Sequence, residues 1–99
     1  MKEGDYGTKL VFTILDENNS PLDLTEATEV RIKAKMNDEI IIDKECAIEG
    51  LHTEGIVSYT TQPGDISSHG RILMEIEITF GSLKKFTTST IKEIIVDKI

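Results

Sequence analysis

The segment Gly70–Phe80 alternates apolar and polar side chains along its whole length, and this alternation constrains the fold more than any other feature of the chain. A helix through the same segment would place the polar residues Glu75 and Thr79 on its apolar stripe, so a period of two describes the pattern better. Leu73 alone interrupts the polar face. The pattern predicts a β-strand with one buried face, formed by the residues at every second position: Ile72, Met74, Ile76, Ile78 and Phe80.

Other segments of the chain also predict strands, and no segment has a convincing helical period. Leu10–Ile14 and Val30–Met36 alternate in the same way as Gly70–Phe80. Short connections rich in Gly, Asn, Asp and Pro separate the segments, and the one at 63–68 leaves room for a single helical turn at most. The sequence therefore predicts an all-β antiparallel sandwich of about seven strands in one domain, residues 1–99, with weaker strands at 39–48, 55–61, 83–88 and 90–97.

The charge balance argues against nucleic acid and membranes as partners. The chain has 18 acidic and 11 basic residues, a formal net charge of -7, and its basic clusters are each flanked by acids. Such a surface repels a phosphate backbone. The N-terminus lacks the apolar core of a signal peptide, and no apolar run approaches the roughly 18 residues of a membrane span. We expect synthesis in the cytoplasm, with no signal peptide.

Two apolar triplets stand out because charged residues bracket each of them. Charges beside an apolar strand discourage uncontrolled strand pairing. Two interpretations remain open: a strand buried on both faces, which is the ordinary one, and an edge used for assembly. The candidate assembly edge consists of Ile40, Ile41, Ile42, Ile94, Ile95 and Val96.

The residues that most often carry catalysis or bind metals form no recognisable constellation in this sequence. The single cysteine, Cys46, shares the parity of Ile40 and Ile42, which in a regular strand places all three on the apolar face and makes the thiol inert. His52 and His69 fall in predicted loops, with no known metal-ligand spacing around them. We therefore expect no enzymatic activity, no catalytic residue, no metal site and no cofactor.

The stretch DENNSPLDLT, Asp16–Thr25, is called here the acidic loop, and its oxygen-rich side chains are typical of a calcium site. An EF-hand needs a glycine at its sixth position and a glutamate at its twelfth, where this chain has Pro21 and Ala27. Calcium bound in another geometry is the less favoured alternative. The loop is predicted to be a corner, in which Asp23 and Thr25 form hydrogen bonds with nearby backbone.

Several segments resemble the N-terminal domain of phage baseplate upper proteins. Residues 8–30 read TKLVFTILD, ENNSPLDLT and EATEV, similar to the strand, the turn of the type LDxNGxPxDLTGA and the second strand of that family. The likeness continues with GIVSYTTQPGDI and SSHG at 55–70 and with MEIEITFGSLKKFTTSTIKEIIV at 74–96. It covers most of the chain, from about residue 5 to residue 97.

This resemblance implies an immunoglobulin-like β-sandwich that serves as a non-catalytic component of a phage or prophage tail. The expected function is to dock a receptor-binding or stalk component at the baseplate. The expected partners are other virion proteins and a second copy of the chain, and the expected location is the virion. The alternative is an extracellular immunoglobulin-like adhesion or carbohydrate-binding module, which would need exposed aromatic side chains.

Overall fold

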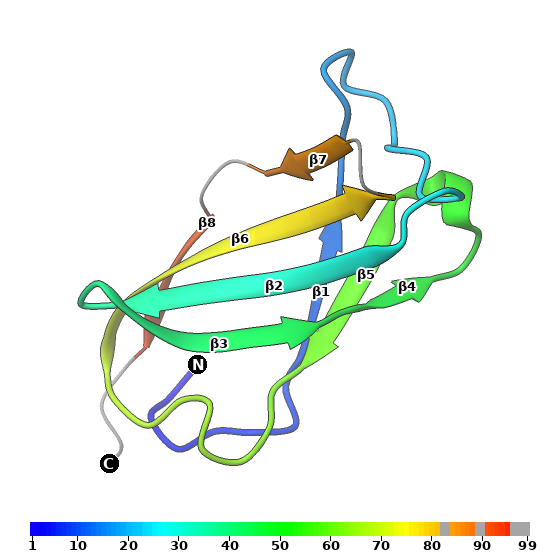
Figure 1. Ribbon diagram of the computed structural model, residues 1–99. Helices are drawn as coiled ribbons and strands as arrows, with labels where there is room; N and C mark the ends of the chain where they lie inside the picture. Colours follow the sequence, from blue (N-terminus) through cyan, green and yellow to red (C-terminus); the bar gives the residue numbers. More distant parts are fainter. Residues whose placement is uncertain (82–83, 89–90, 96–99) are drawn as a thin grey trace.

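The computed structural model describes residues 1–81, 84–88 and 91–95, and the described chain is all-β (Figure 1). Eight strands and one 3-10 turn follow one another along the sequence. They are β1 (Lys9–Thr13), β2 (Glu29–Met36), β3 (Glu39–Glu45), β4 (Ala47–Glu49), η1 (His52–Glu54), β5 (Ile56–Thr60), β6 (Gly70–Phe80), β7 (Lys84–Thr87) and β8 (Ile91–Ile95).

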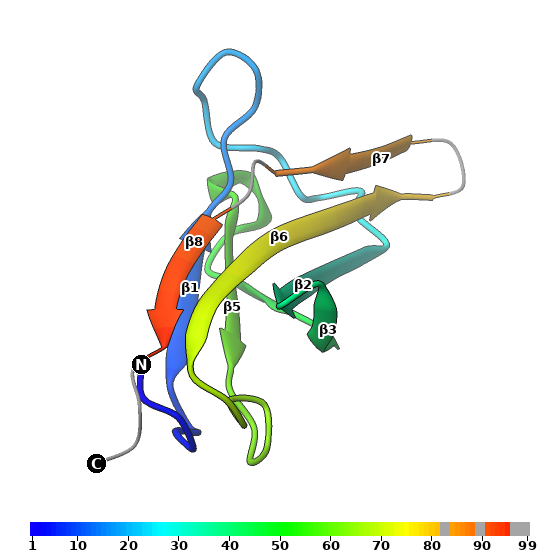
Figure 2. The ribbon, with the colours of Figure 1, turned by 90° about the vertical axis from the view of Figure 1, so that its left-hand side faces the viewer.

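The strands form two antiparallel sheets that pack as a sandwich, which confirms the predicted fold class. The smaller sheet has the order β1-β5-β4, and the larger has the order β3-β2-β6-β7. β8 lies on the same side of β6 as β7: β8 pairs with Gly70–Met74 and β7 pairs with Glu77–Phe80. Figure 2 shows the long, curved β6 with these two short strands along its two halves.

The core fills the space between the sheets with the apolar residues that the alternation predicted. In β6 the residues Ile72, Ile76 and Ile78 are fully buried, and in β2 Ile32 and Ala34 are fully buried opposite them. Because successive side chains of a strand point to opposite faces, a single alternating run supplies one wall of the core. The prediction of one buried face for β6 is confirmed.

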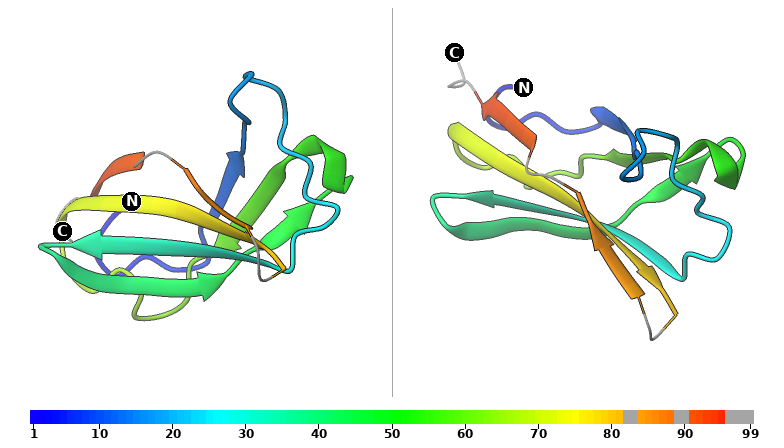
Figure 3. Two further views of the ribbon diagram at one scale, coloured as in Figure 1. Left: turned by 45° about the horizontal axis from the view of Figure 1, so that its top comes forward. Right: turned by 90° about the horizontal axis from the view of Figure 1, so that it is seen from above.

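The predicted single strand at 39–48 is instead two strands in different sheets. β3 pairs with β2 in the larger sheet, and β4 pairs with β5 in the smaller one. Between them the Cys46 N–H donates to the carbonyl oxygen of Val30 at 2.8 Å. Figure 3 shows the two layers and the continuous chain from β3 into β4. The chain therefore crosses between the sheets on this side of the sandwich.

A β-bulge in β3 overturns the prediction that Ile40 and Ile42 share a face. Ile42 pairs with Ala34, and Ile40 pairs with the next residue of β2, Lys35, so Ile41 is the extra residue. The bulge turns Ile40 toward the outer face, where it is 53% exposed, whereas Ile42 is 1% exposed. A period of two holds only in a regular strand, which explains the wrong prediction.

The single helical turn also lies elsewhere than predicted. Residues 63–68 form turns and bends, and the turn η1 lies just before β5. It ends at Gly55, whose φ of 67° is left-handed. A Cβ at this position would lie 2.7 Å from the carbonyl oxygen of Ile14 and 2.9 Å from the backbone nitrogen of Leu22. Glycine is therefore required here both by conformation and by the close approach of the acidic loop.

Candidate functional site

The thiol of Cys46 is buried where the chain crosses between the sheets, as the sequence predicted. Burial raises its pKa to about 11, and the nearby positive charge of Arg31 only partly opposes this. Such a thiol is almost entirely protonated at neutral pH, and the protonated form is a poor nucleophile. His52 and His69 are both exposed, and His69 Nδ1 lies 3.1 Å from Glu3 Oε1.

The carboxylates near the histidines in sequence are engaged in local structure. Glu49 Oε1 accepts a hydrogen bond from the Ser58 hydroxyl at 2.6 Å and lies 2.8 Å from Lys9 Nζ. Both contacts lower the pKa of Glu49, the one with Lys9 more than the one with Ser58. Glu54 Oε1 accepts the N–H of Leu51 at 2.8 Å. Among the described residues no group of three or more His, Cys, Asp and Glu could hold a metal ion.

Asp65 is buried, and its carboxylate fastens the loop before β6 to the core. Its Oδ2 accepts the hydroxyl hydrogen of Tyr59 and the N–H of Gln62, the latter at 2.8 Å. Burial raises the pKa of Tyr59, and the neighbouring carboxylate raises it further, because an ionised phenol would be desolvated and repelled. This buried polar pair is satisfied by its own neighbours, so it supports the fold.

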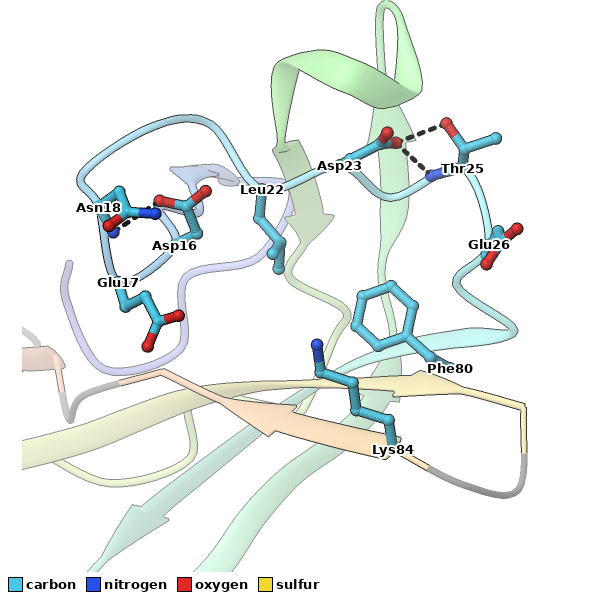
Figure 4. Close-up of a pocket in the computed structure, with 9 residues that line it drawn as sticks. All are labelled: Asp16, Glu17, Asn18, Leu22, Asp23, Thr25, Glu26, Phe80 and Lys84. Atoms are coloured by element: carbon cyan, nitrogen blue, oxygen red, sulfur yellow. Dashed lines mark hydrogen bonds between the residues drawn. The ribbon is translucent and has the colours of Figure 1, made fainter.

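The acidic loop is a corner, as predicted, but the Thr25 hydroxyl bonds to the Asp23 carboxylate and not to backbone as expected. Asp16 Oδ1 accepts the N–H groups of Asn18 at 2.8 Å and Ser20 at 3.0 Å. Asp23 Oδ1 accepts both the N–H of Thr25 at 2.9 Å and its hydroxyl at 2.5 Å, bonds that are visible in Figure 4. Both contacts of Thr25 lower the pKa of Asp23, the hydroxyl contact more than the backbone one. Two of the loop's carboxylates are thus used in turn formation.

The outer face of the larger sheet carries a compensated network of charges. Arg31 Nε lies 2.9 Å from Asp43 Oδ1. Glu77 forms two ion pairs: its Oε2 lies 3.3 Å from Lys33 Nζ, and its Oε1 lies 3.1 Å from Lys85 Nζ. Partial burial acts to raise the pKa of Glu77, but the ion pairs with Lys85 and Lys33 outweigh it and lower the pKa. Two basic side chains of β2, Arg31 and Lys33, are therefore matched by acids on the neighbouring strands β3 and β6.

The first predicted assembly triplet lies on β3, an edge strand of the larger sheet. Ile40 is exposed, Ile41 is half-buried and Ile42 is buried. Lys35 stands between Ile40 on β3 and Leu73 on β6, and Leu73 is 37% exposed. The interpretation of this triplet as buried on both faces is therefore wrong for Ile40.

The second predicted triplet lies at the opposite side of the same sheet. In β8 Ile94 pairs with Arg71 and Ile95 pairs with Gly70, while Val96 lies outside the described residues. The topology places β3, with the first triplet, and β8, with Ile94 and Ile95, on the two outermost sides of one sheet.

The sequence did not predict two hollows with adjoining linings, together called the trough, which lie between β7 on one side and β1 with the acidic loop on the other. One half, about 500 Å³, is apolar and the other, about 600 Å³, is acidic. Figure 4 shows the acidic half. The one signal in the sequence was Val11, an apolar residue on the polar side of an alternating strand. The apolar half is lined by five apolar residues, Val11, Phe12, Ile14, Leu15 and Phe86, and by three threonines, Thr13, Thr87 and Thr88. The acidic half is lined by Asp16, Glu17, Asp23, Glu26, Phe80 and Lys84, together with Asn18, Leu22 and Thr25.

These features are those of a structural β-sandwich domain, with buried polar groups that are satisfied internally and strand edges that pair with no further strand among the described residues. The chain belongs to the BppU N-terminal domain family, whose model matches residues 1–99. The members of this family are N-terminal domains of phage baseplate upper proteins, which are structural domains of the virion tail. No curated protein and no solved structure gives a significant match to the chain. Within the described residues, no helix has the length and apolar character to span a membrane.

Proposed function

We propose that residues 1–99 form one non-catalytic docking domain that attaches a receptor-binding or stalk component to the baseplate by contacts with other virion proteins. Membership of the baseplate family is the observation that carries this proposal. The domain is made in the cytoplasm of the bacterial host and ends in the assembled tail.

The edge of β3 is the first candidate contact. Its outer side presents unpaired backbone groups, since β2 is the only described strand with which it pairs. Ile40 and Leu73 add an exposed apolar patch around Lys35. An extended partner segment can add a strand to such an edge and place alternate side chains on the patch. The charges that bracket the triplet disfavour pairing with unsuitable strands.

The edge of β8, with Ile94 and Ile95, is the second candidate contact in this proposal. An edge at each side of one sheet allows a baseplate protein on one side and a second copy of the chain on the other. Support for the alternative adhesion or carbohydrate-binding function is weaker. Among the aromatic side chains that the structure describes, Tyr6 is the exposed one, at 65%, while Phe80 and Phe86 are half-buried.

The test is incorporation into tail particles purified from the strain that carries the gene. The wild-type domain is expected in the particles by mass spectrometry, and Ile40→Lys is expected to lower its amount by at least about tenfold. Leu51→Lys is the matched control, since Leu51 is 69% exposed in a loop and gains the same charge. Circular dichroism verifies that both variants fold. Absence of the wild-type domain from the particles would refute the docking function. Normal incorporation of Ile40→Lys would show that the edge of β3 takes no part in docking.

A further inference from the structure

The strand β1 has an edge that pairs with no described strand, and its residues of odd number present their backbone groups there. The Thr8 carbonyl accepts the N–H of Thr61, and the Ile14 N–H donates to the carbonyl of Gly55, so residues of even number bond toward β5. In an antiparallel pair, residues that face the partner alternate with residues that face away. The N–H and C=O groups of Lys9, Val11 and Thr13 therefore point to the open edge.

The apolar half of the trough runs beside this edge. Val11 is 56% exposed and Leu15 is 45% exposed, while Phe12 and Phe86 are half-buried and pack against the core. None of the described residues that line this half is ionisable, although 29% of the chain is charged. Depletion of charge around exposed apolar side chains is typical of the centre of a protein interface.

The acidic half adjoins the apolar half, because residues that are neighbours in the chain line the two halves. Asp16 follows Leu15 directly, and Lys84 and Phe86 lie two residues apart on β7, so their side chains share one face. Four carboxylates and one ammonium group line the acidic half. The ammonium of Lys84 lies 5.6 Å from the centre of the Phe80 ring. Four carboxylates against one ammonium group leave an excess of negative charge in this hollow.

We propose that the trough binds an extended segment of a partner protein that combines alternating apolar residues with a lysine or arginine at one end. The segment adds a strand to the open edge of β1 and places its apolar side chains against Phe12 and Phe86. Its basic end enters the acidic half, where the excess of carboxylates complements it. The inference rests on the proposed docking function and deepens it by defining the chemistry of one partner segment.

A library of short random peptides selected on the immobilised domain tests this inference. The enriched peptides are expected to combine apolar alternation with a basic end. Their affinities, measured by fluorescence anisotropy, are expected to fall by at least about tenfold in Val11→Pro and in the double variant Glu17→Lys with Glu26→Lys. Raising the salt concentration is expected to weaken binding to the wild type.

The variants are chosen so that the domain remains folded. The Val11 N–H faces the open edge, so proline removes no bond of the sheet while it blocks an added strand. Glu17 and Glu26 are exposed, and Asp16 and Asp23 stay unchanged because they hold the acidic loop. The matched control combines four changes, Thr53→Lys, Gln62→Lys, Ser67→Lys and Ser68→Lys, at exposed residues outside the trough and outside the edges of β3 and β8; together they change the net charge equally.

Three outcomes would overturn the inference: no enrichment, enriched peptides without a basic residue, or equal affinity of these peptides for the wild type and the trough variants. Incorporation into tail particles separates this failure from that of the docking function. If the peptide selection gives one of these outcomes while the wild-type domain is present in the particles, only the trough is excluded as a binding site. If the wild-type domain is absent from the particles, the docking function itself fails.

Discussion

Truncation of Ile42 and of Ile40 to alanine should have very different effects, although the two residues occupy equivalent positions in the sequence pattern. Ile42 is 1% exposed and faces the core opposite Ala34. Replacement of a buried isoleucine by alanine lowers the free energy of unfolding by about 2 to 5 kcal/mol, and we expect a loss of about 3 kcal/mol for Ile42→Ala. Ile40 is 53% exposed on the outer face. Its truncation should cost less than about 1 kcal/mol, because half of the removed surface is already in water.

Equilibrium unfolding in urea, followed by far-ultraviolet circular dichroism, measures both free energies of unfolding. For a domain of this size the slope is about 1 to 2 kcal/mol per molar urea, so Ile42→Ala should lower the midpoint by roughly 1.5 to 3 M. Ile40→Ala should shift it by well under 1 M. The slope should be unchanged in both variants, since neither changes the surface exposed on unfolding by much.

Equal losses in the two variants would refute the bulge at Ile41. In a regular strand both side chains would point inward, and both truncations would cost about 3 kcal/mol. A larger loss for Ile40 than for Ile42 would mean that the register of β3 against β2 is shifted by one residue. Either result would also invalidate Ile40→Lys as a surface variant in the incorporation experiment.

Two further predictions concern a close backbone contact and a buried thiol. Gly55→Ala should destabilise the domain by about 2 kcal/mol more than Gly81→Ala, measured by urea unfolding. Both glycines have a similar positive φ, 67° and 62°. A Cβ at Gly81 would have no atom of the described residues within 4 Å, whereas a Cβ at Gly55 would meet backbone; equal losses would contradict this. For Cys46, the raised pKa of about 11 means that the folded state holds its proton more tightly than the unfolded state does. The contribution of Cys46 to the free energy of unfolding is therefore complete below pH 9, the pKa of the thiol in the unfolded chain. It is lost as the pH rises toward 11, by at most roughly 3 kcal/mol. Cys46→Ala should remove this part of the alkaline loss, and an unchanged pH profile would show that the thiol is not desolvated.

The acidic loop illustrates what local sequence can determine about a candidate site. Its turn residues and its place between two alternating segments predicted a corner, and the hydrogen bonds of Asp16 and Asp23 confirm it. Asp, Asn and Ser form such bonds with backbone two to four residues away, so the information is present in the sequence itself. The fit of the loop against Gly55 depends on a segment more than thirty residues later and was not predicted.

The sequence by itself determined the fold class, the buried face of β2 and β6, the inert environment of Cys46 and the membership of the baseplate family. The first three follow from the period of two and from residue types, which are local properties. The family follows instead from the likeness of the segments at 8–30, 55–70 and 74–96 and from the family match over residues 1–99. Only the tertiary structure decided that residues 39–48 divide between two sheets, that Ile40 turns outward at a bulge and that β7 lies opposite β1 across a trough. Each of these depends on contacts between distant segments, and the bulge and the crossing are exceptions to strand regularity that a pattern of alternation does not encode.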